Sequence, residues 1–141
     1  MTLLCHTRIA SLITAIGSVP LFVYAFSATA RLLPVEFAQL YLYSVLAFIA
    51  GINWITALQK NVWSMLLWSI VLSLLPLVAM IAQYFDWLSH TGAWLAMLML
   101  LWLALAHDYW QRDQVDLTYF FCFRRSGTVF LSIAIICILV M

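Results

Sequence analysis

Long stretches without a charged side chain are the feature that most constrains how this chain can fold. Apolar runs free of Asp, Glu, Lys and Arg cover residues 9–30, 37–59, 62–84 and 91–106. A helix needs ~20 such residues to cross the ~30 Å hydrocarbon core of a bilayer. Charged residues make up 8% of the chain, against about 25% in ordinary soluble domains. Because the runs lack the alternating pattern of a membrane β-barrel, the sequence predicts an all-α integral membrane protein.

The predicted architecture is a single domain over residues 1–141, a bundle of five transmembrane helices. We expect the helices at about 9–30, 37–59, 62–84, 91–106 and 124–141, with a short polar or amphipathic segment at 107–123. The first run is longer than the ~7–15 residues of a signal-peptide core, so we expect a retained helix rather than a cleaved signal. Pro20 and Pro76 lie inside two of the predicted helices, where proline bends the helix axis.

The start of the fifth helix leaves two alternatives open. Its uncharged run begins at Ser126, so the helix is either short or begins near Leu117 and carries Arg124 and Arg125 about two turns inside it. In the second case both arginines must reach the interface or pair with acidic residues. We favour an interfacial amphipathic stretch at 117–123 that leads into the helix.

The distribution of basic residues predicts the orientation in the membrane. With five helices, one face holds Arg31, whereas the other holds Arg8, Lys60, Arg112, Arg124 and Arg125. Cytoplasmic segments are enriched in Lys and Arg. We therefore expect a bacterial inner-membrane protein with a cytoplasmic N-terminus and a periplasmic C-terminus.

Several function classes lack their usual residues in this sequence. The net charge of +1 gives no basic footprint for nucleic acid. The cysteines and histidines show no metal-ligand spacing, and we expect the histidines to be solvated at the interfaces. The sequence contains no HExxH motif, glycine-rich phosphate loop or paired intramembrane carboxylates. We therefore expect a protein that is not an enzyme and that needs no metal or cofactor.

The stretch from Tyr41 to Leu58 carries the most unusual small and polar residues of the chain. At 100° per residue, Tyr43, Ala47, Ala50 and Trp54 share one side of a helix. That side alternates aromatic and small side chains, a pattern that favours close helix packing.

Asn53 is the one amide well inside a predicted spanning helix. It has two interpretations: a hydrogen bond to a neighbouring helix, or a hydrogen bond to a bound ligand such as a quinone carbonyl. The candidate ligand pocket consists of Asn53, Trp54, Pro20 and Pro76.

Asp108, Arg124 and Arg125 form a second candidate site, in the densest charge cluster of the chain. Asp108 ends the predicted fourth helix at about the level where Arg124 begins the fifth, so we predict an ion pair that ties the two helices together. The functional alternative is a site for an anionic headgroup or substrate around the two arginines.

The order of motifs resembles the membrane family that contains mitochondrial transmembrane protein 69, a domain-of-unknown-function family. The likeness covers most of the chain. It rests on Gly17 to Phe22, Tyr43 to Phe48 with Gly51 and Trp54, Pro76, Asp108, and Arg124 with Thr128. The family pattern has a histidine at the position of Asn53 and a glycine at that of Ile55. The resemblance implies a fold and an inner-membrane or mitochondrial location rather than an activity.

The expected function is that of a small accessory or assembly subunit that packs against a larger membrane complex, for example a respiratory one. The alternative is a small carrier or binder of a lipid, a quinone or another hydrophobic molecule. The expected partners are the lipid bilayer and such a complex. A binder should enclose a cavity lined by Asn53 and Trp54.

Overall fold

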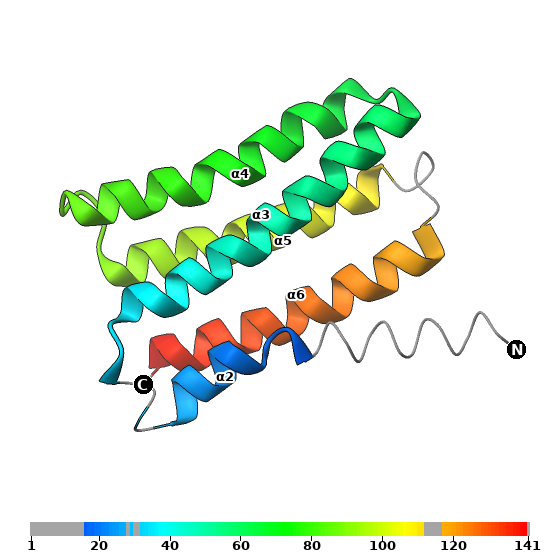
Figure 1. Cartoon of the computed structure of the whole chain (residues 1–141). Coiled ribbons are helices and arrows are strands. Elements are labelled where there is room, and N and C mark those ends of the chain that lie inside the picture. Colours follow the sequence, from blue (N-terminus) through cyan, green and yellow to red (C-terminus); the bar gives the residue numbers. More distant parts are fainter. Residues whose placement is uncertain (1–15, 28, 30–31, 112–116, 141) are drawn as a thin grey trace, which may run out of the picture. The chain divides into compact units, whose positions relative to one another are not determined.

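A computed structural model describes residues 16–27, 29, 32–111 and 117–140, with side chains from residue 124 onward in the last range. Five helices make up most of this part and no strand occurs in it: α2 (Val19–Phe26), α3 (Val35–Lys60), α4 (Trp63–Tyr84), α5 (His90–Trp110) and α6 (Leu117–Val140) (Figure 1). The chain divides into two compact units. We call Gln39–Leu100 the hairpin unit, and Met1–Ala38 with Leu101–Met141 the terminal unit.

The hairpin unit contains α3 from Gln39 onward, all of α4, and α5 as far as Leu100. Helices α3 and α4 end in the same type of C-terminal cap. Asn61 and Asp86 have positive φ angles of 56° and 59°. The next residue after each returns a backbone N–H to a carbonyl five residues earlier, Val62 to Ala57 at 3.0 Å and Trp87 to Ala82 at 2.8 Å. This is the Schellman arrangement that ends a helix abruptly, so consecutive helices reverse direction within a few residues.

The start of α5 is set by Ser89. Its Oγ accepts the backbone N–H of Gly92 at 3.0 Å, and its carbonyl accepts the N–H of Ala93 at 2.9 Å. A serine that bonds the third helical residue is a preferred N-cap, because it satisfies an otherwise unpaired N–H group. The helix therefore begins at His90, one residue before the predicted start.

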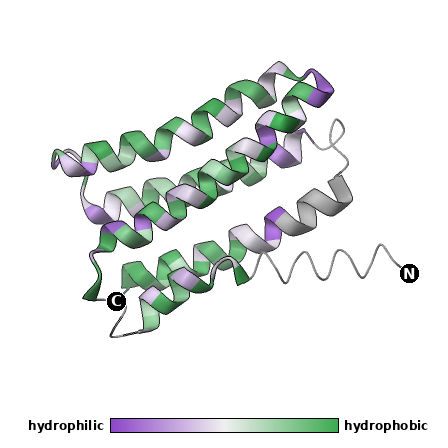
Figure 2. Cartoon of the chain, viewed as in Figure 1, coloured by the Kyte–Doolittle hydropathy of each residue, from purple (hydrophilic) through white to green (hydrophobic). Residues whose placement is uncertain are grey.

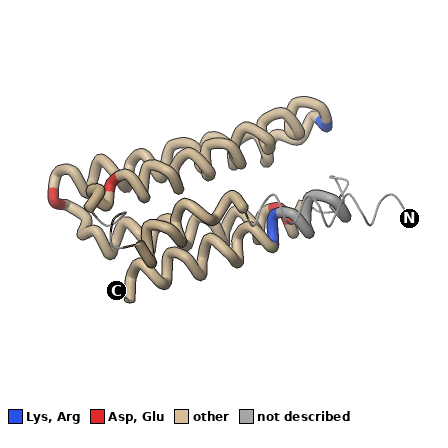
Figure 3. The backbone as a smooth tube through the Cα atoms, turned by 60° about the horizontal axis from the view of Figure 1, so that its bottom comes forward, with Lys and Arg blue, Asp and Glu red and all other residues tan. Residues whose placement is uncertain are grey.

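The charges of the hairpin unit are confined to its turns. In residues 39–100 the charged side chains are Lys60, at the α3–α4 turn, and Asp86, at the α4–α5 turn. Figure 2 shows mainly hydrophobic helix bodies between these ends, and Figure 3 shows no charged residue along them. The 22 residues of α4 extend about 33 Å, close to the thickness of a bilayer core. Its ends carry the exposed aromatic residues Trp63 and Tyr84, as is typical of residues at membrane interfaces.

In the part of the chain that the structure describes, three helices are long and apolar enough to cross a membrane: α3, α4 and α5. The predicted number was five. The eight residues of α2 cover about 12 Å, too little to span. The uncharged part of α6, residues 126–140, covers about 22 Å, because Arg124 and Arg125 precede it.

In the terminal unit, the short helix α2 packs against α6 (Figure 1). A turn at Gly17–Ser18 precedes Val19, and Pro20 lies in the first turn of α2. The prediction of one helix over 9–30 bent at Pro20 therefore differs from the structure within the described residues. Proline lacks an N–H group, which the first turn of a helix does not need, so Pro20 is well placed to start α2. Leu21 and Ala25 form its buried face.

Helices α5 and α6 are both longer than the sequence analysis predicts. Helix α5 continues past residue 106 to Trp110, and α6 begins at Leu117 rather than 124. The stretch 117–123, expected to be a separate interfacial segment, is therefore part of α6. No proline or glycine occurs between Gly92 and Gly127, so nothing in the local sequence stops either helix at the predicted boundary.

Candidate functional site

A buried ion pair joins α5 to α6 in the terminal unit. The Nη2 atom of Arg124 lies 2.7 Å from Oδ2 of Asp108, and the two side chains are 7% and 2% exposed. The predicted ion pair between these residues is therefore confirmed. The distance is that of a strong, charge-assisted hydrogen bond.

The helical repeat places both charges on buried faces. Asp108 follows Leu101, Ala104 and Leu105 on the buried side of α5, at spacings of three to four residues that keep side chains on one face. Arg124 similarly leads the buried face of α6, which continues through Thr128, Leu131, Ser132 and Ile135. The ion pair thus closes one end of an otherwise mostly apolar contact surface.

Two buried hydroxyl groups on α6 extend this surface. Thr128 and Ser132 are 4% and 5% exposed. Ser132 Oγ donates to the backbone carbonyl of Thr128 at 2.7 Å, so the hydroxyl of Ser132 is satisfied within its own helix. The hydroxyl of Ser132 is therefore engaged within α6 and is not a free donor for a ligand.

Arg125 has a different environment from its neighbour. It is exposed, and it lines an open hollow of about 410 Å³ together with Ser126, Val129 and Phe130. Consecutive helical residues are ~100° apart around the axis, so Arg125 points away from the face that holds Arg124. The predicted cluster of three charges is therefore split into a buried pair and a separate exposed cation.

Asn53 is the second candidate and lies in the hairpin unit. Its side chain is 0% exposed, and neither Oδ1 nor Nδ2 has a hydrogen-bond partner within the described part of the chain. An unpaired buried polar group costs about 1–3 kcal/mol. Ser69 is 1% exposed. Ser69 and Asn53 are equally distant in sequence from the turn residue Asn61, one on each side of it. The α3–α4 hairpin thus brings two buried polar residues to a similar level.

The other residues of the predicted ligand pocket have varied surroundings. Pro76 is fully buried within α4, which continues as a helix through it. Trp54 is 43% exposed and therefore lies largely on the outer surface of α3. Pro20 is exposed and belongs to the terminal unit. Of the four, Asn53 and Pro76 share buried surroundings in the same unit.

The buried side of α3 also differs from the predicted packing side. Its buried residues in the hairpin unit follow a helical repeat: Gln39, Leu42, Leu46, Ile49, Ala50, Asn53 and Ala57. Of the predicted side, Ala50 is buried, whereas Trp54 is exposed. Gly51 is exposed, and an added Cβ there would have no neighbour within 4 Å.

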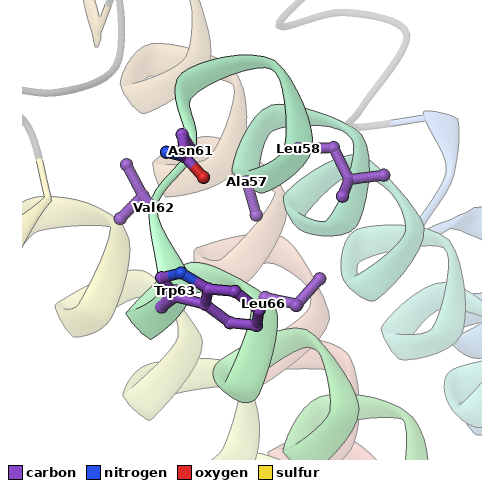
Figure 4. A pocket seen from close by; sticks show the side chains of 6 residues that line it. All are labelled: Ala57, Leu58, Asn61, Val62, Trp63 and Leu66. Atoms are coloured by element: carbon purple, nitrogen blue, oxygen red, sulfur yellow. The ribbon is translucent and has the colours of Figure 1, made fainter.

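A small hollow lies at the α3–α4 turn, beyond Asn53 along the helix. Ala57, Leu58, Asn61, Val62, Trp63 and Leu66 line it (Figure 4), and its volume is about 60 Å³. Pockets for drug-sized ligands measure about 300–1,000 Å³, so this hollow holds a few water molecules at most. The sequence analysis missed it because it results from the left-handed residue Asn61.

One polar contact between α4 and α5 was also missed. Nε2 of Gln83 and Nδ1 of His90 lie 2.7 Å apart, across the turn that contains Asp86. His90 therefore has a structural partner in the hairpin unit. The described residues contain no group of three or more His, Cys, Asp or Glu side chains that could hold a metal ion.

Comparisons of the chain with protein-family models, with curated proteins and with solved structures found no match.

Proposed function

We propose that this protein is a small multi-pass protein of a bacterial inner membrane, with its N-terminus in the cytoplasm and its C-terminus in the periplasm. Its role is that of a non-enzymatic accessory or assembly subunit of a larger membrane complex. The resemblance to the family of mitochondrial transmembrane protein 69 supports this location. This orientation requires that residues 9–30 and 124–141 also cross the membrane; five of the six basic residues then lie on the N-terminal side, which supports it.

One observation carries the proposal: the outer surfaces of the spanning helices are apolar and aromatic. Phe48 is 70% exposed, Leu67 62% and Trp102 48%, whereas Lys60 and Asp86 lie at the turns. Such a surface has no favourable contact with water, so lipid or another membrane protein must cover it. The buried ion pair, in turn, joins two helices of the chain itself.

Exposed Gly51 adds support for a protein partner. Glycine in a helix interior costs about 1 kcal/mol relative to alanine. Contact with lipid gives no compensation, whereas small residues let a second membrane helix approach closely. Ser44, Phe48, Ile55 and Leu58 are exposed on the same helical face.

The test is purification from the source membrane in native nanodiscs, followed by mass spectrometry of everything that remains bound. We expect a stoichiometric larger complex with the wild type and its loss with Gly51→Ile, which fills the open face of α3. Thr56→Val, at a half-buried position of the same helix, is the matched control. A wild-type protein that purifies without a protein partner would rule out the subunit role.

The amide of Asn53, which has no hydrogen-bond partner among the described residues, favours a second candidate, a binder of a lipid or quinone. In that case a carbonyl or hydroxyl group of the ligand would form a hydrogen bond with the amide of Asn53. The ligand would then co-purify with the protein. The variant Asn53→Leu keeps the side-chain size but removes both hydrogen-bonding atoms. Lost ligand with intact folding would support the binder, whereas unchanged lipid and quinone content would exclude it.

A further inference from the structure

The outer face of α6 carries a cation at one end and apolar side chains along the rest. Arg125, Ser126, Val129 and Phe130 line the open hollow of about 410 Å³, and the two apolar residues follow the cation by about one helical turn. Ile133 and Ile136 continue the face at helical spacing and are 45% and 49% exposed. The distance from Arg125 to the end of α6 is about 22 Å.

The positive charge of Arg125 would be stabilised by a bound anion. Among the described residues no acidic side chain pairs with it, in contrast to Arg124, which Asp108 neutralises. An arginine at the border of a bilayer is stabilised by an anionic group, and its planar guanidinium can bind two phosphate oxygens at once. A phosphate at the level of the lipid headgroups meets this requirement.

The apolar part of the face decides which anion fits. A free phosphate or a carboxylate has no apolar group that could contact Val129, Phe130 and the isoleucines that follow. An uncharged quinone would leave Arg125 without a counter-charge. A molecule with an anionic head and a long apolar tail matches both ends of the face.

We propose that this face of α6 binds an anionic phospholipid, with its phosphate on the guanidinium of Arg125 and one acyl chain over Val129 and Phe130. The site rests on the part of the proposed function that places α6 in a bilayer. It does not require the protein to be a subunit of a complex.

The test measures the lipids that stay bound to the purified protein. The full chain is reconstituted in nanodiscs of phosphatidylcholine with one-fifth phosphatidylglycerol, then released into the gas phase for native mass spectrometry. We expect phosphatidylglycerol to be enriched over its bulk fraction. Because one basic side chain near an anionic surface contributes about 1 kcal/mol, Arg125→Gln should lower the enrichment about fivefold.

Matched variants distinguish lipid binding at Arg125 from a general effect of the protein's positive charge. Lys60→Gln removes an exposed cation at a turn of the hairpin unit and should leave the enrichment unchanged. Arg125→Lys should retain most of it, and Phe130→Ala should reduce it without a change in net charge. Equal losses for Arg125→Gln and Lys60→Gln would overturn the site, as would displacement of the lipid by millimolar inorganic phosphate.

Membrane insertion is checked separately by extraction of native membranes with carbonate at high pH. A chain that is released by carbonate would refute the proposed membrane location itself. A chain that resists extraction but shows no preference for phosphatidylglycerol would refute the lipid site and leave the proposed function standing. Retention of a protein instead of a lipid, lost in Arg125→Gln, would also overturn the proposal.

Discussion

The buried pair of Asp108 and Arg124 predicts a strong non-additivity between two substitutions. The side chains are 2% and 7% exposed and their charged atoms are 2.7 Å apart. Asp108→Leu leaves a buried guanidinium without its counter-charge, and Arg124→Met leaves a buried carboxylate. Each single variant should therefore lose about 3–5 kcal/mol of unfolding free energy. The double variant Asp108→Leu/Arg124→Met has no uncompensated charge and should be close to the wild type or up to about 1–4 kcal/mol more stable.

The assay is a double-mutant cycle on the full chain in one detergent, with unfolding followed by near-ultraviolet circular dichroism. The four proteins of the cycle give a coupling energy between the two sites, which should be at least the sum of the two single losses, about 6–10 kcal/mol. Arg125→Met is the control, because this neighbouring arginine is exposed, and its unfolding free energy should change by less than about 0.5 kcal/mol. Two single losses that add in the double variant would refute the reasoning.

Two further predictions concern the ends of helices in the hairpin unit. At Asn61, whose φ is 56°, Asn61→Val should cost about 1–2 kcal/mol because a β-branched residue resists the left-handed conformation, whereas Asn61→Gly should be neutral or slightly stabilising. Thermal unfolding midpoints measure both, and equal midpoints would contradict the role of the turn. At the start of α5, Ser89→Ala removes the oxygen that accepts the N–H of Gly92 and should cost about 1 kcal/mol. Faster hydrogen exchange at the first turn of α5 would report this loss, and unchanged exchange would argue against the cap.

The order of the helices and the lengths of α3 and α4 could be predicted from the sequence. A run such as 62–84 is long, uncharged and bounded by aromatic residues, and bilayer thickness then dictates a helix close to the observed α4. The ion pair was predictable because Asp108 lies near the C-terminal end of one helix and Arg124 near the start of the next, which places the two side chains at about the same level.

Which face of a helix is buried could not be predicted in the same way. In a soluble protein, polar residues mark the outer face of a helix. In α3 the outer residues Phe48 and Ile55 are as apolar as the inner residues Leu46 and Ile49. The rotation of the helix about its axis is therefore not encoded in hydropathy. The side with Tyr43 and Trp54 was predicted to pack closely against a helix from its aromatic and small residues alone.

Proline also carries two meanings that the sequence does not separate. Pro20 starts α2, whereas Pro76 lies inside α4. In the first turn of a helix, proline loses no hydrogen bond. In the interior of a helix, proline removes one backbone hydrogen bond. Which applies depends on tertiary packing, here on the turn at Gly17–Ser18.

The two abrupt turns of the hairpin unit restrict how any other molecule can reach it. The turn between α3 and α4 has two residues, Asn61 and Val62. The turn between α4 and α5 has five residues, Phe85 to Ser89. The unit therefore offers almost no aqueous epitope. An antibody, a protease or a soluble regulator would find little to recognise, and an inhibitor of this unit would have to dissolve in the membrane first.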